Sequence, residues 1–134
     1  MGQSFYNIFV HLIWRTKKRE PFIHKDFEEM LFQVIKDKCH KFGFELIATG
    51  NTLDHIHILL AINPQEKLSD FIGEAKGASA YRINHYTTHE LYWQDGYGCI
   101  SIGKSALENV KRYVMNQGAS PNNGGVDAGD GDDC

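Results

Sequence analysis

The strongest constraint on the fold comes from residues 54–60, Asp-His-Ile-His-Ile-Leu-Leu, whose pattern is typical of a buried β-strand. Successive side chains of an extended backbone point to opposite faces. His55 and His57 therefore project to the same side, close enough to share one cation, while Ile56 and Ile58 face the core. A His-x-His pair is more often a polar strand face than a metal site. Metal binding would need a third ligand elsewhere.

The hydrophobic pattern predicts seven elements. Strands are expected at 5–14, 44–49, 55–62 and 91–102, and helices at 26–41, 70–85 and 105–117. This order, β-α-β-β-α-β with an added C-terminal helix, is the ferredoxin-like arrangement of the α+β class. It contains a four-stranded antiparallel sheet with two helices on one face. The first and third strands are central neighbours there, and the open face is a common platform for single-stranded nucleic acid.

Polar residues mark the expected helix starts. Asp26 and Ser69 are candidate N-caps. Ser105 and Glu108 have the spacing of a capping box, in which a serine and an acid three residues later satisfy the first backbone N–H groups.

The chain divides into one folded domain, residues 1–118, and a Gly/Asp-rich tail, residues 119–134. The chain has 134 residues and 42% hydrophobic content, enough for one core. The tail has one branched aliphatic residue and no aromatic, so we expect it to be disordered. Its spaced aspartates lack the terminal Glu of a calcium loop.

Local clusters of charge are more informative than the net charge of −3, because the tail holds four of the 17 acids and no base. Eight of the 14 bases lie before residue 42. They include Arg15, Lys17, Lys18 and Arg19, which follow the first strand and Trp14. This basic loop fits a solvated turn and a contact with a nucleic-acid backbone equally well. Trp14, Trp93 and Tyr97 are candidates either for base stacking or for the core.

The cysteines and the hydropathy pattern predict a cytoplasmic protein. Cys39, Cys99 and Cys134 are far apart and form no Cys-x-x-Cys motif, which favours reduced thiols. We find no apolar run of membrane-spanning length and no signal peptide at the N-terminus.

The last helix supplies candidates for the missing ligand and a nucleophile. Tyr113 and Gln117 lie one turn apart on a polar face, and Lys111 and Arg112 precede the tyrosine. An amide oxygen of Gln117 suits a hard cation such as Mg²⁺ or Mn²⁺, and Tyr113 could attack a phosphate oriented by that cation. Alternatively, Tyr113 is an ordinary residue of an amphipathic helix.

Five segments together resemble one protein family. They are Trp14-Arg15-Thr16-Lys17, residues 54–60, Lys76-Gly77-Ala78-Ser79, residues 91–97 and Tyr113-Val114-Met115-Asn116-Gln117. In this order they resemble the His-hydrophobe-His (HUH) single-strand transposases of small bacterial insertion sequences, the IS200-like family, and the related REP-associated tyrosine transposases. The resemblance spans residues 5–117. Many relatives continue past the glutamine with ordered sequence, whereas this chain enters its tail.

The resemblance implies a metal-dependent enzyme that cuts and rejoins single-stranded DNA through a covalent 5′-phosphotyrosine intermediate. His55, His57 and Gln117 would hold Mg²⁺ or Mn²⁺, and Tyr113 would be the nucleophile. The substrate would be single-stranded DNA beside a hairpin, and the protein would be a homodimer with shared active sites. Besides the basic loop, the candidates for DNA contact are Lys76, Arg82, Lys111 and Arg112.

Three other functions fit the sequence. The domain could bind single-stranded nucleic acid without catalysis, or be a phosphodiesterase that uses water, with Tyr113 as a bystander. It could also be a domesticated relative that nicks repeat hairpins without transposing.

Overall fold

The computed structural model describes residues 8–117 and contains the predicted ferredoxin-like sheet. The predicted tail and the first residues of the first expected strand lie outside this range. The elements, in chain order, are β1 (Phe9–Arg15), α1 (Glu28–Phe42), β2 (Glu45–Asn51), β3 (His55–Ala61), α2 (Leu68–Tyr86), β4 (Gly98–Ile102) and α3 (Leu107–Met115). The four strands form one antiparallel sheet in the order β2-β3-β1-β4. The predicted fold class is confirmed.

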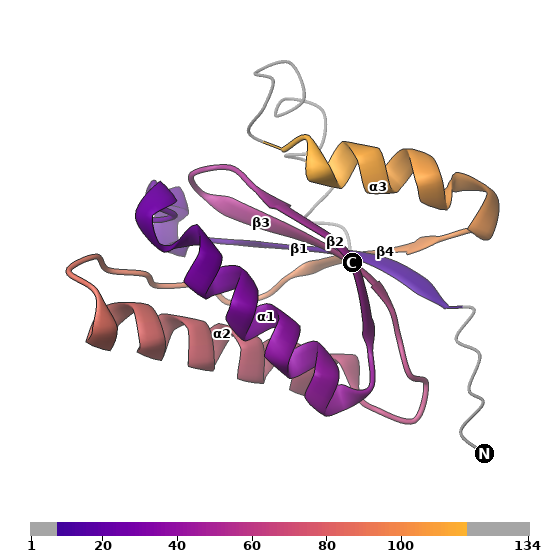
Figure 1. The fold of residues 1–134 in the computed structure, drawn as a ribbon, viewed down its shortest axis with the longest axis horizontal. Helices are drawn as coiled ribbons and strands as arrows, with labels where there is room; N and C mark the ends of the chain where they lie inside the picture. The colour runs from indigo at the N-terminus through magenta and orange to yellow at the C-terminus, as the bar shows by residue number, and fades with distance from the viewer. Residues whose placement is uncertain (1–7, 118–134) are drawn as a thin grey trace.

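The sheet separates two unequal layers of helices, with α1 and α2 on one face and α3 on the other (Figure 1). The large core lies under α1 and α2, where alternate residues of the central strands are buried. Leu12 and Trp14 of β1 and Ile56 and Ile58 of β3 belong to it, each with at most 1% of its surface exposed. Burial of this apolar surface is the main stabilising contribution in such a layer. The prediction that Ile56 and Ile58 face the core is confirmed.

The strand register brings the basic end of β1 beside the histidines of β3. Arg15 pairs with His55, and Ile13 pairs with His57. On the other side of β3, Gly50 of β2 pairs with His57. The face that carries His55 and His57, called here the histidine face, is therefore built from three adjacent strands.

Helix α3 lies on the histidine face and covers part of the face expected to be open. Val114 is completely buried against Ala48 of β2 and Leu59 of β3. The contact is close because Gly50 has no side chain: a Cβ there would lie 1.9 Å from the Val114 carbonyl oxygen and 3.2 Å from Cβ of Gln117. Gly50 thus permits the end of α3 to approach the sheet opposite His57.

The expected boundaries differ from the structure in the fourth strand and at the helix starts. β4 begins at Gly98, because residues 91–97 form a loop in which Trp93 makes an isolated bridge with Thr16. None of the three expected side-chain caps forms at α1, α2 or α3. Short 3₁₀ helices, Lys25–Phe27 and Lys104–Ala106, precede α1 and α3 and move the helix starts past Asp26 and Ser105. α2 begins at Leu68, one residue before Ser69.

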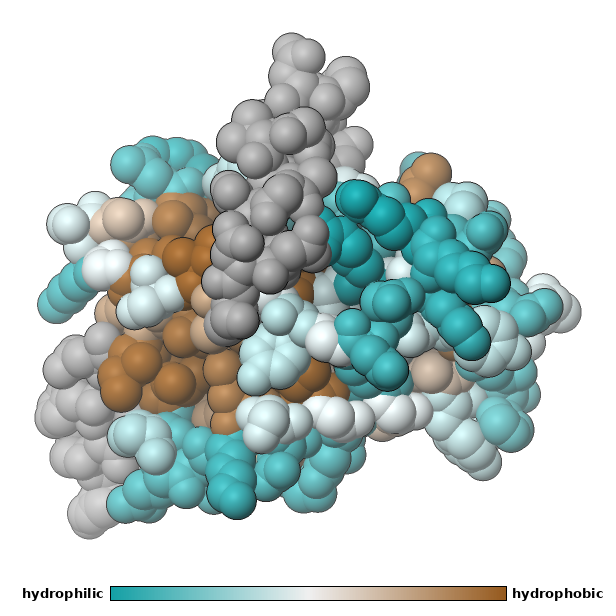
Figure 2. Space-filling view, turned by 180° about the vertical axis from the view of Figure 1, so that it is seen from behind, coloured by the Kyte–Doolittle hydropathy of each residue, from teal (hydrophilic) through white to brown (hydrophobic). Residues whose placement is uncertain are grey.

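The surface seen from behind combines a hydrophobic area on one side with a largely hydrophilic area on the other (Figure 2). Met115 at the end of α3 and Ile8 before β1 are exposed apolar residues, at 59% and 43%. Within residues 8–117 we find no helix with both the length and the apolar character required to cross a bilayer.

Replacing Gly50 by alanine is expected to destabilise the protein by about 1–3 kcal/mol, as overpacking typically does. The added methyl would collide with the Val114 carbonyl and displace the end of α3. The free energy of unfolding from urea titrations measures the change.

Gly77→Ala is the matched control, because Gly77 is exposed in α2 and a Cβ there would meet no atom within 4 Å. Alanine favours the helix over glycine, so this variant should gain roughly 0.5–1 kcal/mol. Equal stability of Gly50→Ala and the wild type would contradict the close approach of α3 to β2.

Candidate active site

Two buried histidines form the centre of the histidine face. His55 and His57 are 4% and 0% exposed, and their ring centroids lie 4.8 Å apart. They project from the same side of β3, as strand alternation predicts. The structure thus brings the two rings together on the face opposite the main core.

The first histidine is oriented by the turn that precedes β3. His55 Nδ1 lies 2.6 Å from Asp54 Oδ1 and 2.8 Å from Thr52 Oγ1. A carboxylate can only accept, so His55 Nδ1 donates to Asp54, and Nε2 is the nitrogen whose lone pair the neutral ring offers. Nε2 is buried and has no hydrogen-bond partner among residues 8–117. A histidine held in this way presents Nε2 as a metal ligand.

The carboxylate of Asp54 is stabilised in its charged form. Partial burial acts to raise its pKa, but the hydrogen bond and charge of His55, the hydrogen bond from Thr52 and the charge of Arg19 together lower the pKa below its usual value. Asp54 therefore stays ionised and holds the His55 ring in one tautomer.

The second histidine contacts a third, His11 of β1, which the sequence did not single out. His11 Nε2 and His57 Nδ1 are 2.9 Å apart, and the two rings are stacked with centroids 5.1 Å apart. Burial, with the nearby His55, His11 and Arg15, lowers the pKa of His57 to about 2. His57 is consequently neutral near pH 7, as a metal ligand must be. The signal for His11 was strand alternation: it stands four residues before Arg15, on the same face.

Tyr113 approaches the histidines from α3, and Gln117 follows two residues past the end of that helix. The Tyr113 ring is edge-on to His57 and to His11, with centroids 5.9 Å and 6.1 Å apart. Gln117, 7% exposed, donates from Nε2 to the Tyr113 carbonyl oxygen at 3.0 Å. Its Oε1 is buried and accepts no hydrogen bond within the described chain, residues 8–117. The end of α3 and the turn that follows it thus hold the phenol against the histidines and Gln117, with its buried amide oxygen, against Gly50, which pairs with His57.

The basic loop lies next to this site. Lys17–Arg19 form an exposed 3₁₀ turn, and Arg19 Nε is 3.8 Å from Asp54 Oδ2. Lys18 and Arg19 have φ values of 54° and 56°, an uncommon conformation for residues with a side chain. The backbone N–H of Lys17 donates to the Tyr92 carbonyl oxygen and that of Lys18 to the side-chain oxygen of Gln94, which holds this turn. Arg15 lies beside His55 through the strand register.

The other predicted basic residues occupy different surroundings. Lys76 Nζ donates to the carbonyl oxygens of Gln94 and Gly96 at 2.8 Å and 2.6 Å. Burial lowers its pKa despite the nearby charge of Asp95. Lys76 thus fastens the loop before β4 to α2.

Arg82 is exposed on α2, in the helical layer away from the histidine face. Lys111 and Arg112 lie on α3, where Arg112 donates to the side chain of Asn109. Contact of these residues with DNA stays a prediction.

A hollow of about 250 Å³ opens beside Arg15, between the end of β1 and residues 94–97. Of the three aromatic candidates for stacking, Trp14 and Tyr97 line this hollow, and they are 1% and 37% exposed. Trp14 belongs to the core, and the partly buried Trp93 packs edge-on against it while donating to Ser79 Oγ. Tyr97 is therefore the candidate whose ring remains accessible.

A family model described as "Transposase IS200 like" matches residues 4–117, which include all the site residues above. The chain belongs to the IS200-like transposase family. This confirms the resemblance found in the sequence.

Individual transposases align over most of the chain. The ISDra2 transposase TnpA of Deinococcus radiodurans is 27% identical over 119 residues, covering 84% of this chain and 85% of the relative. The transposase for insertion sequence element IS200 of Salmonella typhimurium is 23% identical over 125 residues, covering 87% of this chain and 81% of the relative.

Two solved structures share the fold of this IS200-like chain. A Deinococcus radiodurans protein described as a transposase superposes with a TM-score of 0.64 and 28% identity, over 90% of this chain and 98% of that one. A REP-associated tyrosine transposase bound to a REP hairpin gives a TM-score of 0.64 at 15% identity, and the match covers 85% of this chain and 69% of that one.

The buried neutral state of His57 predicts acid sensitivity of this transposase. The pKa of the His57 imidazole falls from 6.5 to about 2 on folding. Between these two pH values the unfolded chain binds a proton on His57 that the folded chain does not. The contribution of His57 to the free energy of unfolding is therefore fully present above pH 6.5 and is lost as the pH drops. The free energy of unfolding, measured with EDTA present, should fall by up to about 1.4 kcal/mol per pH unit between pH 6 and 4.5 from this residue.

His57→Gln should show a smaller pH slope than the wild type, because the group that gains a proton on unfolding is gone. His40→Gln is the matched control, since His40 is exposed on α1, and it should keep the wild-type slope. Identical slopes in all three proteins would contradict a neutral His57 in the fold.

Proposed function

We propose that this protein cuts and rejoins single-stranded DNA through a covalent 5′-phosphotyrosine on Tyr113, with a divalent metal, Mg²⁺ or Mn²⁺, held by His55, His57 and Gln117. One observation carries the proposal: in a member of the IS200-like transposase family, the Tyr113 ring stands against His57 on a buried face. Gln117, just past the end of α3, is tied to the same segment by its hydrogen bond to the Tyr113 carbonyl oxygen.

The residues present fit a divalent cation. His55 Nε2 and Gln117 Oε1 are buried acceptors that no donor within residues 8–117 satisfies. Leaving buried polar atoms without a partner costs free energy, which a bound cation would recover. Mixed imidazole and amide-oxygen ligands suit Mn²⁺ and are compatible with Mg²⁺. When bound, such a cation would polarise the phosphate and stabilise charge on the departing oxygen.

Tyrosine attack explains rejoining without an external energy source. Tyr113 Oη would bond to phosphorus, and the 3′-oxygen would leave with the bonding electrons and gain a proton from solvent, while the phenolic proton is lost to solvent. One phosphodiester is exchanged for another, so a free 3′-hydroxyl can reverse the step. A phenol with a pKa of about 10 is mostly protonated near pH 7, and Arg15 and the basic loop supply positive potential nearby.

The surroundings of the site favour an unpaired strand as substrate. The exposed bases of the 3₁₀ turn suit a phosphate backbone, and the hollow lined by Tyr97 could receive a base. A REP-associated tyrosine transposase with this fold was solved bound to a REP hairpin, which supports a hairpin beside the cleaved strand.

A homodimer that shares active sites is part of the proposal. Val114 is the one fully buried residue of α3, with Leu107 and Val110 partly buried, so few buried contacts would have to break for α3 to exchange between subunits. The hydrophobic area in Figure 2 provides surface for association.

The decisive experiment incubates the protein with hairpin-flanked single-stranded DNA labelled at the 5′ or the 3′ end, with Mg²⁺ or Mn²⁺. We expect a denaturation-resistant protein–DNA adduct that carries the 3′ label. Tyr113→Phe should abolish it because the nucleophile is removed, and His57→Ala should lower it at least about 100-fold. An adduct in Tyr113→Phe would exclude Tyr113 as nucleophile.

The same assay separates the alternatives. Cleavage without an adduct would favour a water-using phosphodiesterase, and binding without cleavage a non-catalytic module. Mixing Tyr113→Phe with His57→Ala should restore part of the adduct if α3 is exchanged, because one composite site is then intact. No recovery would place each site within one chain. Mobility of a marked element in cells distinguishes an active transposase from a domesticated nickase.

His11 is predicted to be a positioning residue that fixes the tautomer of His57. His11→Phe removes the partner of His57 Nδ1 and should weaken the apparent Mn²⁺ affinity about 10–100-fold, with adduct formation recovering at high Mn²⁺. His11→Gln keeps a hydrogen-bond acceptor for His57 and should lose less Mn²⁺ affinity than His11→Phe. The readout is the Mn²⁺ dependence of adduct formation.

His40→Gln serves as the control and should leave the Mn²⁺ dependence unchanged. A loss in His11→Phe that high Mn²⁺ does not recover would argue against a positioning role.

A further inference from the structure

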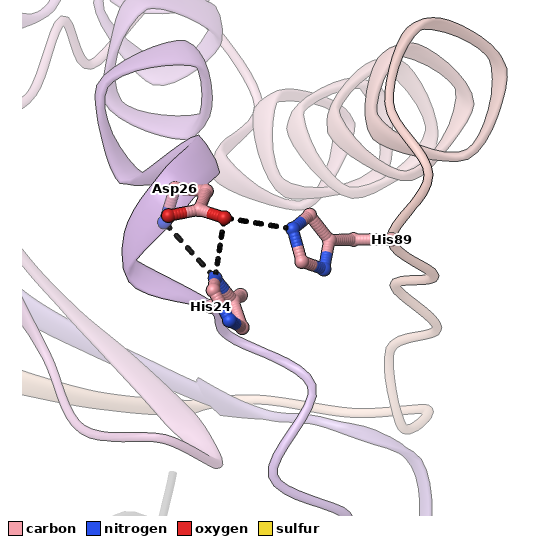
Figure 3. A group of neighbouring side chains, drawn as sticks. All are labelled: His24, Asp26 and His89. Atoms are coloured by element: carbon pink, nitrogen blue, oxygen red, sulfur yellow. Dashed lines mark hydrogen bonds and ion pairs between the residues drawn. The ribbon is translucent and has the colours of Figure 1, made fainter.

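We propose a second metal site, for a Zn²⁺-class transition metal, formed by His24, Asp26 and His89 in the layer of α1 and α2. His24 and Asp26 belong to the turn that opens α1, and His89 comes from the loop after α2 (Figure 3). This site is separate from the proposed DNA chemistry and does not depend on it.

The three side chains converge, and the two distances from Asp26 to the histidines suit a tetrahedral ion. Asp26 Oδ2 lies 3.4 Å from His24 Nδ1 and 3.3 Å from His89 Nε2, and all three ligand atoms lie within 4.8 Å of one another. With metal–ligand bonds of about 2.0–2.1 Å, two ligand atoms of tetrahedral zinc lie about 3.3–3.4 Å apart. Charge-assisted N–H···O bonds are shorter, at about 2.7–2.9 Å. The two distances from Asp26 Oδ2 to the histidine nitrogens are therefore closer to those between two ligands of one zinc ion than to those of strong ion pairs.

The donor set selects the kind of metal. Two imidazoles and one carboxylate are a zinc ligand set, whereas Mg²⁺ prefers oxygen ligands and retains its waters. Three protein ligands would leave a position for water. A hollow of about 330 Å³, lined by His24, Thr88, His89 and Glu90, provides room for it.

Small adjustments complete the site. The His24 and His89 rings are nearly parallel, 25° apart with centroids at 4.1 Å, so one ring must turn to aim both nitrogens at the ion. His24 is the freer ring, because its side chain is 51% exposed and rotation about χ2 is soft, whereas His89 also rests edge-on against the buried Phe27. His24 Nδ1 would give up the 3.1 Å hydrogen bond from the Asp26 backbone, which is solvent-exposed.

A bound ion would connect the start of α1 to residues 87–97. This loop contacts the basic end of β1: Tyr92 accepts from the Lys17 backbone, and Gln94 donates to that of Arg15. The proposed site thus anchors the far end of the segment that supports the basic loop, and metal occupancy would stabilise both.

The test is a Zn²⁺ titration of the metal-free full chain in excess Mg²⁺, in a His57→Ala background that removes the first histidine site. The His57→Ala protein should bind about one more equivalent of Zn²⁺ than either double variant, His57→Ala with His89→Gln or His57→Ala with Asp26→Asn. Co²⁺ in place of Zn²⁺ should give tetrahedral visible absorption that these additions abolish. Zn²⁺ should also raise the Tm of the background and not of the added variants.

The matched control is His40→Gln combined with His57→Ala. It should still bind the extra equivalent of Zn²⁺, show the tetrahedral Co²⁺ absorption and gain Tm with Zn²⁺. Circular dichroism checks that each variant folds, as expected for side chains that are exposed or, for His89, partly exposed. Equal Zn²⁺ binding with and without His89, or an equal loss in His40→Gln, would overturn the site as adventitious surface binding.

Discussion

The close approach of α3 to the sheet at Gly50 is the contact on which the rest of the site depends. Helix backbones normally stay farther from a strand because side chains separate them. Here the missing Cβ lets the Val114 carbonyl and Gln117 lie against β2 at the position paired with His57. The position of the α3 backbone consequently places the Tyr113 ring against His57 and His11.

Burial of the histidines has a cost that the surrounding hydrogen bonds offset. A ring nitrogen in a dry environment requires a partner. Asp54 satisfies one nitrogen of His55, and His11 satisfies one nitrogen of His57. The other nitrogen of His55 is buried and has no partner among the described residues. The same burial keeps His57 neutral. Structural and chemical demands therefore favour a single arrangement of the rings.

The loop between α2 and β4 links the layers of the molecule. Lys76 fastens it to α2, Thr16 and Trp93 bridge it to β1, and His89 connects it to the turn before α1. Its backbone also holds the basic turn, whose residues Lys18 and Arg19 have strained φ values. The geometry of the basic surface beside the site therefore depends on contacts made in the opposite layer.

Much of this architecture was determined by the sequence alone. The two periodicities, 2 for strands and 3.6 for helices, are local properties, so the order of elements, the common face of His55 and His57 and the i, i+4 pairing of Tyr113 with Gln117 could be predicted. The caps at Asp26, Ser69 and Ser105 could not, because 3₁₀ turns and neighbouring contacts set the helix starts.

Only the tertiary structure decided which face α3 covers, that His11 joins His57, and that His24, Asp26 and His89 meet. These contacts join residues far apart in the chain. They depend on strand register and on one absent methyl group at Gly50, which leave no periodic signal in the sequence.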